Sequence, residues 1–217
     1  MPTQRHTLRG ELLLIIVIFL NSFGVVLMLE AGFGISAISS VPYAFSVVLP
    51  QVSLGLWTTL FQVLLVLSLM ILRRRFVPQY LLSFVVGAAF GGMLDVYDLL
   101  LAGLPQGLGY RLVYFIASYI IICFGIALSN RCQMPIIPTD LWPRECAAIV
   151  NMPYSRIKIP FDVACVIVTG VMTLVFVHRL DGIGIGTIVA AFTMGRVIQA
   201  FESVFDRYFQ VVSCMAR

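Results

Sequence analysis

Long hydrophobic runs, separated by short polar stretches, are the main pattern along this chain. Six of them, at about residues 11–30, 52–72, 80–102, 110–129, 159–177 and 183–204, reach the roughly 20 residues that a helix needs to cross a bilayer. Backbone groups inside lipid have to form hydrogen bonds with each other, which favours helices. The pattern therefore predicts an all-α bundle of six transmembrane helices, with residues 1–217 as a single transmembrane domain.

Two segments between these runs are apolar but broken by glycine and proline. They are residues 32–50, "GFGISAISSVPYAFSVVLP", and residues 133–153, "QMPIIPTDLWPRECAAIVNMP". Each is predicted to form a short proline-interrupted helix after the first span of its half. One interpretation is a connector lying on the membrane surface. The other is a re-entrant helix that lines a solute site with hydroxyl groups; these would come from Ser36, Ser39, Ser40 and Thr139.

The two halves of the chain repeat one another. Phe23-Gly24 matches Phe124-Gly125 at a distance of 101 residues, and Pro42 matches Pro143 at the same distance. We expect repeat one at residues 11–102 and repeat two at 110–204. Three spans per half is an odd number, so the second half would enter the membrane from the opposite side. Such inverted repeats are common in secondary transporters.

Composition supports a membrane location. The chain is 60% hydrophobic and 11% charged, with a mean hydropathy of +1.02, whereas a soluble domain is about half apolar and a quarter charged. The first apolar run is too long for a signal-peptide core and is expected to be a retained helix.

The distribution of basic residues predicts the orientation. Only Arg111 and Arg179 fall on one side of the predicted spans, and the other side is much richer in arginine and lysine. The positive-inside rule assigns the richer side to the cytoplasm, so both termini are expected to be cytoplasmic. The basic residues on this side are Arg5, Arg9, Arg73, Arg74, Arg75, Arg131, Arg144, Arg156, Lys158, Arg207 and Arg217.

Several chemistries have no matching motif. His6 and His178 are far apart, and the five cysteines lack metal-ligand spacing, so no metal site or other cofactor is expected. The chain has no P-loop and no matched nucleophile and base, so an enzyme is not expected. The scattered basic residues do not predict nucleic-acid binding. The glycine-rich "GIGIGT" at 182–187 opens the sixth span, and no predicted strand comes before it. A phosphate-binding glycine loop normally follows a strand, so helix packing explains this segment better.

Charged and polar residues within spans are the candidate solute-binding residues, because such residues are costly in lipid and usually face a bundle interior. Gly87 and Gly91 in the third run and Gly182 and Gly186 before the sixth form GxxxG patterns, which allow close helix packing. Asp95 and Arg196 are 101 residues apart and so occupy equivalent positions in the two halves. They are interpreted as charged groups at opposite depths of one polar pathway, and not as a direct ion pair. The candidates are Asp95, Asp162 and Arg196 as charged elements and Asp140, Ser39, Thr187 and Gln199 as polar lining.

Two of these candidates have simpler interpretations. Arg196 is expected to face the interior between the halves and hold an anionic group, but it could instead extend to the membrane interface. Lys158 and Asp162 could be only a pair at a helix start.

Several motifs resemble the YczE/YitT-like family of bacterial membrane proteins. They are "PTD" before the short helix of the second segment, "RIKIPFD" at the fifth span, "GIGIGTI" at the sixth and "FGGMLDVYD" in the third. The resemblance implies a six-helix protein of the bacterial plasma membrane. The first short segment lacks an acidic residue like that of "PTD", so the resemblance does not imply a symmetric role for the two segments.

The expected function is transport of a small polar or charged solute, by a secondary transporter or facilitator whose site lies between the repeats. The alternative is a non-transporting membrane factor that assists or regulates a partner protein, without a polar cavity connecting the halves. The expected partners are a small-molecule solute and membrane lipid. A homodimer remains open, because the GxxxG faces could pack within one chain or between two.

Overall fold

The computed structural model describes residues 6–74, 78–132, 134 and 136–212, and this part of the chain is mostly helical. Six of its helices are long and apolar enough to cross a membrane, which confirms the predicted all-α membrane bundle. They are α1 (Gly10–Ala31), α3 (Leu54–Arg73), α4 (Pro78–Leu101), α5 (Leu108–Arg131), α7 (Tyr154–Phe176) and α8 (Ile185–Tyr208). Arg5, Arg75, Cys214 and Arg217 lie outside the described residues.

Large hydrophobic side chains cover the outside of these six helices. Ile71, Leu99, Ile185 and Phe192 are each at least 70% exposed. Water would not solvate such a surface well, whereas lipid chains would. A smaller core fills the inside of the bundle and includes Val17, Met28, Leu69 and Leu94.

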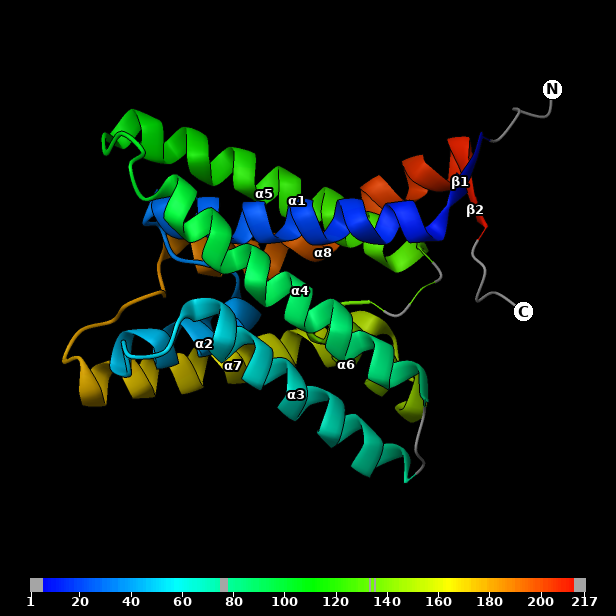
Figure 1. Cartoon of the computed structure of the whole chain (residues 1–217), viewed down its shortest axis with the longest axis horizontal. Helices are drawn as coiled ribbons and strands as arrows, with labels where there is room; N and C mark the ends of the chain where they lie inside the picture. The colour runs from blue at the N-terminus through cyan, green and yellow to red at the C-terminus, as the bar shows by residue number, and fades with distance from the viewer. Residues whose placement is uncertain (1–5, 75–77, 133, 135, 213–217) are drawn as a thin grey trace.

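Helices α1 and α5 pack against each other in the centre, and α4 lies against α1 as α8 lies against α5 (Figure 1). The close crossing of α1 and α5 depends on glycine. A methyl group at Gly24 of α1 would lie 2.7 Å from Cγ1 of Ile122, and one at Gly125 of α5 would collide with the amide of Asn21.

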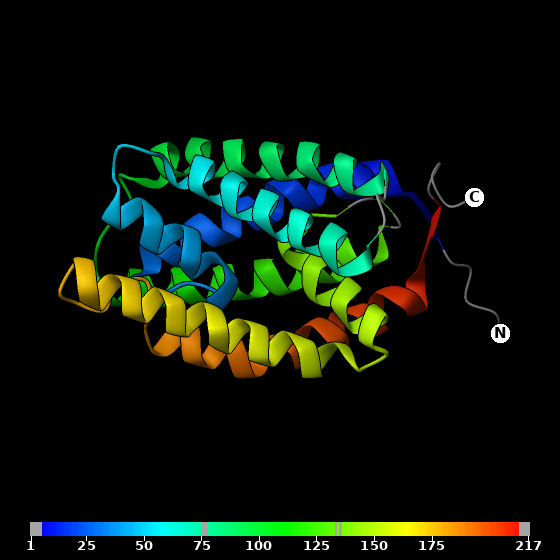
Figure 2. The same cartoon turned by 90° about the horizontal axis from the view of Figure 1, so that it is seen from below.

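Two short helices, α2 (Ala37–Val48) and α6 (Pro138–Val150), begin inside the bundle. Both run outward from the middle of the molecule, toward opposite ends (Figures 1 and 2). Ile35 and Ala37 at the start of α2, and Ile137 and Pro138 at the start of α6, are buried. The starts of both short helices therefore lie in the core of the bundle.

Two glycine-rich loops hold the start of α2 in place. The backbone N–H of Ile35 donates to the carbonyl of Gly182 at 3.1 Å, and that of Gly186 donates to the carbonyl of Phe33 at 2.8 Å. Gly34 has a φ of +95° and lies against Gly184 and Thr187. The "GIGIGT" segment therefore allows close backbone packing, as the sequence predicted.

One element was not expected from the sequence. Strand β1 (His6–Arg9) pairs in parallel with β2 (Phe209–Val212), with His6 opposite Phe209. The two strands continue from α1 and α8 at the same end of the bundle (Figure 1).

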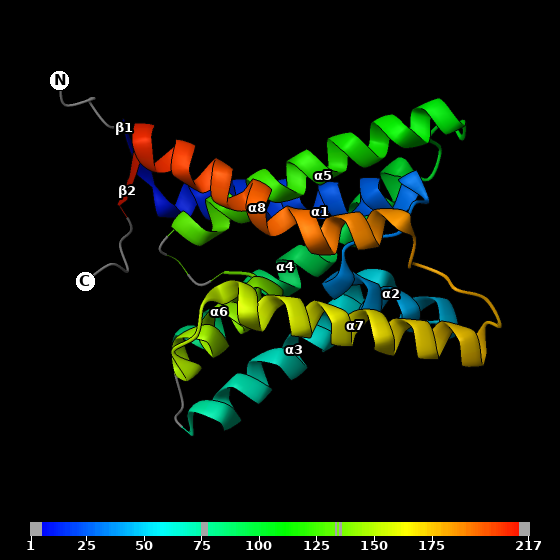
Figure 3. The same ribbon diagram turned by 180° about the vertical axis from the view of Figure 1, so that it is seen from behind.

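Basic residues gather at this same end, called the β end below. Arg9, Arg74, Arg131 and Arg207 lie at helix ends there, whereas Arg111 and Arg179 lie at the opposite end (Figures 1 and 3). Ion pairs tie helices together at the β end: Arg73 binds Glu145, and Arg131 lies 2.7 Å from Asp206 and 3.5 Å from Glu202.

Candidate functional site

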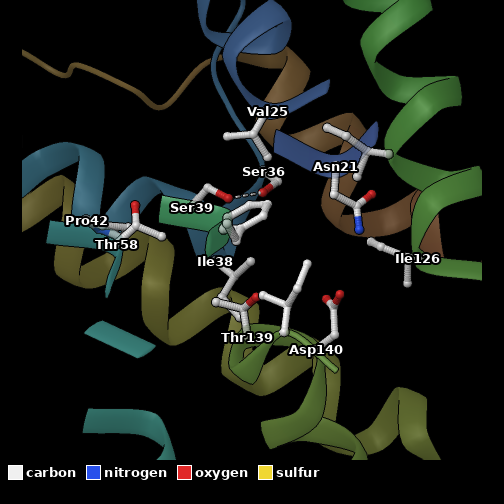
Figure 4. Close-up of a pocket in the computed structure, with 13 residues that line it drawn as sticks. Asn21, Val25, Ser36, Ile38, Ser39, Pro42, Thr58, Ile126, Thr139 and Asp140 are labelled. Carbon is white, nitrogen blue, oxygen red and sulfur yellow. Dashed lines mark hydrogen bonds between the residues drawn. The ribbon is translucent and has the colours of Figure 1, made fainter. Parts of the chain in front are cut away.

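A small cavity of about 40 Å³ lies where the two short helices begin. This is room for about three water molecules. Its wall comes from both short helices and from four spans (Figure 4). The lining residues are Asn21, Val25, Ser36, Ile38, Ser39, Pro42, Thr58, Phe90, Ile122, Ile126, Ile137, Thr139 and Asp140.

The N-terminal turn of α2 supplies hydrogen-bond donors to this wall. Ser36 is the residue before the helix, but its hydroxyl donates to Oγ of Ser39 at 2.9 Å and does not cap the helix. The backbone N–H groups of Ala37 and Ile38 have no acceptor among the described residues. An uncapped helix start carries a partial positive charge and is suited to an acceptor or an anion.

The N-terminal turn of α6 supplies a carboxylate. Asp140 is 8% exposed and forms no side-chain hydrogen bond or ion pair within the described part of the chain. Burial raises the pKa of Asp140 from 3.8 to about 6, although the charges of Lys158 and Arg144 act to lower it. In Figure 4 the carboxylate points toward the amide of Asn21, with no bond between them.

Asn21 and Gln62 are polar residues that the sequence analysis did not select. Asn21 is 4% exposed and lines the cavity, and its Oδ1 atom has no partner among the described residues. Gln62 lies one turn from the lining residue Thr58; it is 1% exposed and neither of its amide atoms has a partner in the described structure. A lone amide in an apolar run, as in "FLNSF" and "LFQVL", was the signal that could have revealed both.

A partly buried ion pair on α7 lies within electrostatic reach of Asp140. Lys158 donates to Oδ1 of Asp162 at 2.6 Å, and Asp162 is 7% exposed. The charges of both residues act on the pKa of Asp140. Asp162 is not part of the cavity wall; it forms the pair with Lys158 that the sequence suggested.

Asp95 has another role in this structure. Its carboxylate accepts hydrogen bonds from the hydroxyl of Ser53 at 2.7 Å and from the backbone N–H of Gly55 at 2.8 Å. These groups form the start of α3, whose partial positive charge a carboxylate stabilises. Asp95, predicted as a solute-binding residue, thus lies outside the wall of this cavity and anchors α3 to α4.

The remaining candidates also lie away from the cavity. Arg196 and Gln199 are exposed on α8, and Arg196 makes no hydrogen bond or ion pair with the described residues. This corrects the expectation that they face the interior. Thr187 is fully buried, but its hydroxyl accepts from the backbone N–H of Gly184 at 3.3 Å and caps α8. Of the seven candidates, only Ser39 and Asp140 line the cavity itself; Ser36 and Thr139, expected as lining hydroxyls in the re-entrant interpretation, line it as well.

The fold defines an α-helical multi-pass membrane protein with a small cavity at its centre, where the two short helices begin. The chain belongs to a family described as "Family of unknown function (DUF6198)", which matches residues 8–203. No curated protein and no solved structure matches the chain.

Proposed function

We propose that the protein is a secondary transporter or facilitator for a small polar or charged solute, which binds in the central cavity. One observation carries this proposal: two short helices begin at the same small cavity, to whose mostly apolar wall they contribute Ser36, Ser39, Thr139 and Asp140. Broken helices that end near the membrane midplane are a common way to build a transport site.

We further propose that the two halves form inverted repeats with the cavity between them. The crossing of α1 and α5 supports this, because Gly24 meets Ile122 while Gly125 meets Asn21. Asn21 and Ile122 are 101 residues apart, as are Gly24 and Gly125, so equivalent positions exchange partners as in a two-fold contact. In the same way α2 packs on α7 while α6 packs on α3.

Contacts at both ends of the bundle could open alternately to release the solute. At the β end, Arg73 binds Glu145 and Arg131 binds Asp206. At the other end, the hydroxyl of Tyr43 donates to Asp181 at 3.0 Å. Opening one set while the other stays closed would give alternating access without moving the site.

The alternative function, a membrane factor that only assists a partner protein, predicted no polar cavity connecting the halves. The polar groups that both short helices contribute to the cavity, Ser39 and Asp140, support transport over this alternative. The YczE/YitT-like resemblance, the bacterial plasma membrane and the cytoplasmic position of the β end remain parts of the proposal.

Reconstitution into liposomes tests the proposed function. We expect the protein to raise uptake of at least one small polar solute above that of protein-free liposomes. Ser39→Leu should abolish this uptake by filling the cavity, whereas Ser46→Leu, on α2 but outside the cavity wall, should retain it. Uptake that is unchanged by Ser39→Leu, or absent for all solutes, would refute the proposal.

A further inference from the structure

The two short helices present opposite polarities to the cavity. Ser39 is the third residue of α2 and Asp140 is the third residue of α6, and both line the cavity. A carboxylate in the first turn of α6 offsets the partial positive charge of that helix start. The start of α2 has no acidic residue in its first turn and keeps its positive character.

The hydrogen-bonding groups follow the same division. On the α2 side the N–H groups of Ala37 and Ile38 have no acceptor among the described residues. On the opposite side the carboxylate of Asp140 is an acceptor without a bonded partner among the described residues. Asp140 is 8% exposed, so water from outside the bundle does not solvate its carboxylate freely.

From this division we propose that the cavity binds a small zwitterion, with its carboxylate at the start of α2 and its ammonium group against Asp140. This inference rests on the proposed role of the cavity as the solute site.

A singly charged solute would pair with the polar groups on only one side of the cavity. An anion would leave the carboxylate of Asp140 without a partner and close to another negative charge. A cation would leave the donors of α2 unpaired beside a positive charge. Leaving a buried polar or charged group without a partner costs free energy, so the site should discriminate against both.

The neighbouring charges favour the ionised carboxylate of Asp140. Lys158 lowers the pKa of Asp140 more than Asp162 raises it, although these two residues pair with each other at 2.6 Å. Arg144 acts on Asp140 through space without a bond to it. The small volume of the cavity restricts the zwitterion to the smallest compounds of this class.

Four probes of similar size test the inference in the purified full-length protein at neutral pH. Glycine is the zwitterion, acetate the anion, ethylammonium the cation and acetamide the neutral compound. The dissociation constant of each is measured from the concentration dependence of the thermal unfolding temperature. We expect glycine to bind about 30-fold or more tightly than each of the other three.

Two carboxylate variants test whether Asp140 binds the ammonium group of glycine. Asp140→Asn keeps the shape but removes the charge, so it should weaken glycine binding about 30-fold and strengthen acetate binding relative to glycine. Asp98→Asn, which changes an exposed carboxylate of α4 outside the cavity, should leave both affinities unchanged.

Equal or tighter binding of acetate, ethylammonium or acetamide would overturn the zwitterion assignment, as would no binding of glycine. Liposome uptake separates this failure from failure of the proposed function. Uptake of any of the other three probes that is blocked by Ser39→Leu would preserve the transport proposal while refuting a zwitterionic substrate.

Discussion

At the scale of single residues, the carboxylate of Asp140 stands out as a buried acidic group without a bonded partner among the described residues. It also lines the central cavity. Burial without a partner costs stability when the group is ionised. A solute cation or ammonium group would supply the missing partner.

Replacing Asp140 by Asn should stabilise the empty protein at neutral pH. The pKa of Asp140 is about 6 in the folded protein against an ordinary value of 3.8, so the folded state holds the proton more tightly. Stability is then greatest below about pH 4 and falls as the pH rises through about 6. The difference corresponds to about 3 kcal/mol above that range.

Thermal unfolding of the wild type and Asp140→Asn between acidic and neutral pH measures this effect. The variant should be the more stable protein at neutral pH, and the gap should close in acid. A gap that is constant with pH would show that Asp140 does not titrate in this range.

Arg196 lies on the exposed surface of α8, which reverses the expectation from its sequence context. Long basic side chains on such surfaces extend their charge toward the membrane interface. Arg196→Met should therefore leave solute affinity within about twofold of the wild-type value and permit normal membrane insertion. Arg196→Lys serves as the charge-preserving control. A tenfold loss of solute affinity in the Met variant alone would restore Arg196 to the site.

At the scale of helices, glycine residues allow α3 and α4 to pack closely against each other. Gly55 and Gly91 face each other, and a methyl group at Gly91 would lie 2.5 Å from the carbonyl oxygen of Gly55. The GxxxG pattern of Gly87 and Gly91 thus packs within one chain, while α7 and α8 barely touch one another.

The neighbouring Gly91 and Gly92 offer a matched pair of substitutions on one helix. Gly91→Ala should lower stability by about 1–3 kcal/mol, because the added methyl overpacks the contact with α3. Gly92→Ala should be neutral or slightly stabilising, because its methyl would meet nothing within 4 Å. Denaturation in detergent compares the two. Equal effects would mean that α3 and α4 do not pack closely through Gly91.

The distribution of basic residues at the two ends sets the expected orientation of the whole molecule. Single cysteines at Arg74, Gly103 and Arg179, in a background without native cysteines, can be labelled with a membrane-impermeant maleimide in intact cells. We expect labelling at 103 and 179, and protection at 74 until the membrane is permeabilised. Labelling of position 74 in intact cells would invert the proposed orientation.

The hydrophobic pattern alone determined the number of spans and the membrane class. A run of about 20 apolar residues has one stable form in lipid, so this prediction needed no tertiary information. The proline and glycine content of residues 32–50 and 133–153 also revealed the two short helices. Even Ser39 and Asp140 followed from their places near the predicted helix starts.

Only the tertiary structure decided which polar residues share the site. Asp95 and Arg196 resembled site residues because they are charged groups in apolar runs, but the rotation of each helix about its axis determines where they point. That rotation depends on contacts between distant segments, such as Gly55 with Gly91. Asn21 and Asp140 face one cavity because α1 crosses α5 while α6 turns inward. No local pattern encodes these contacts, since each depends on how the whole bundle packs.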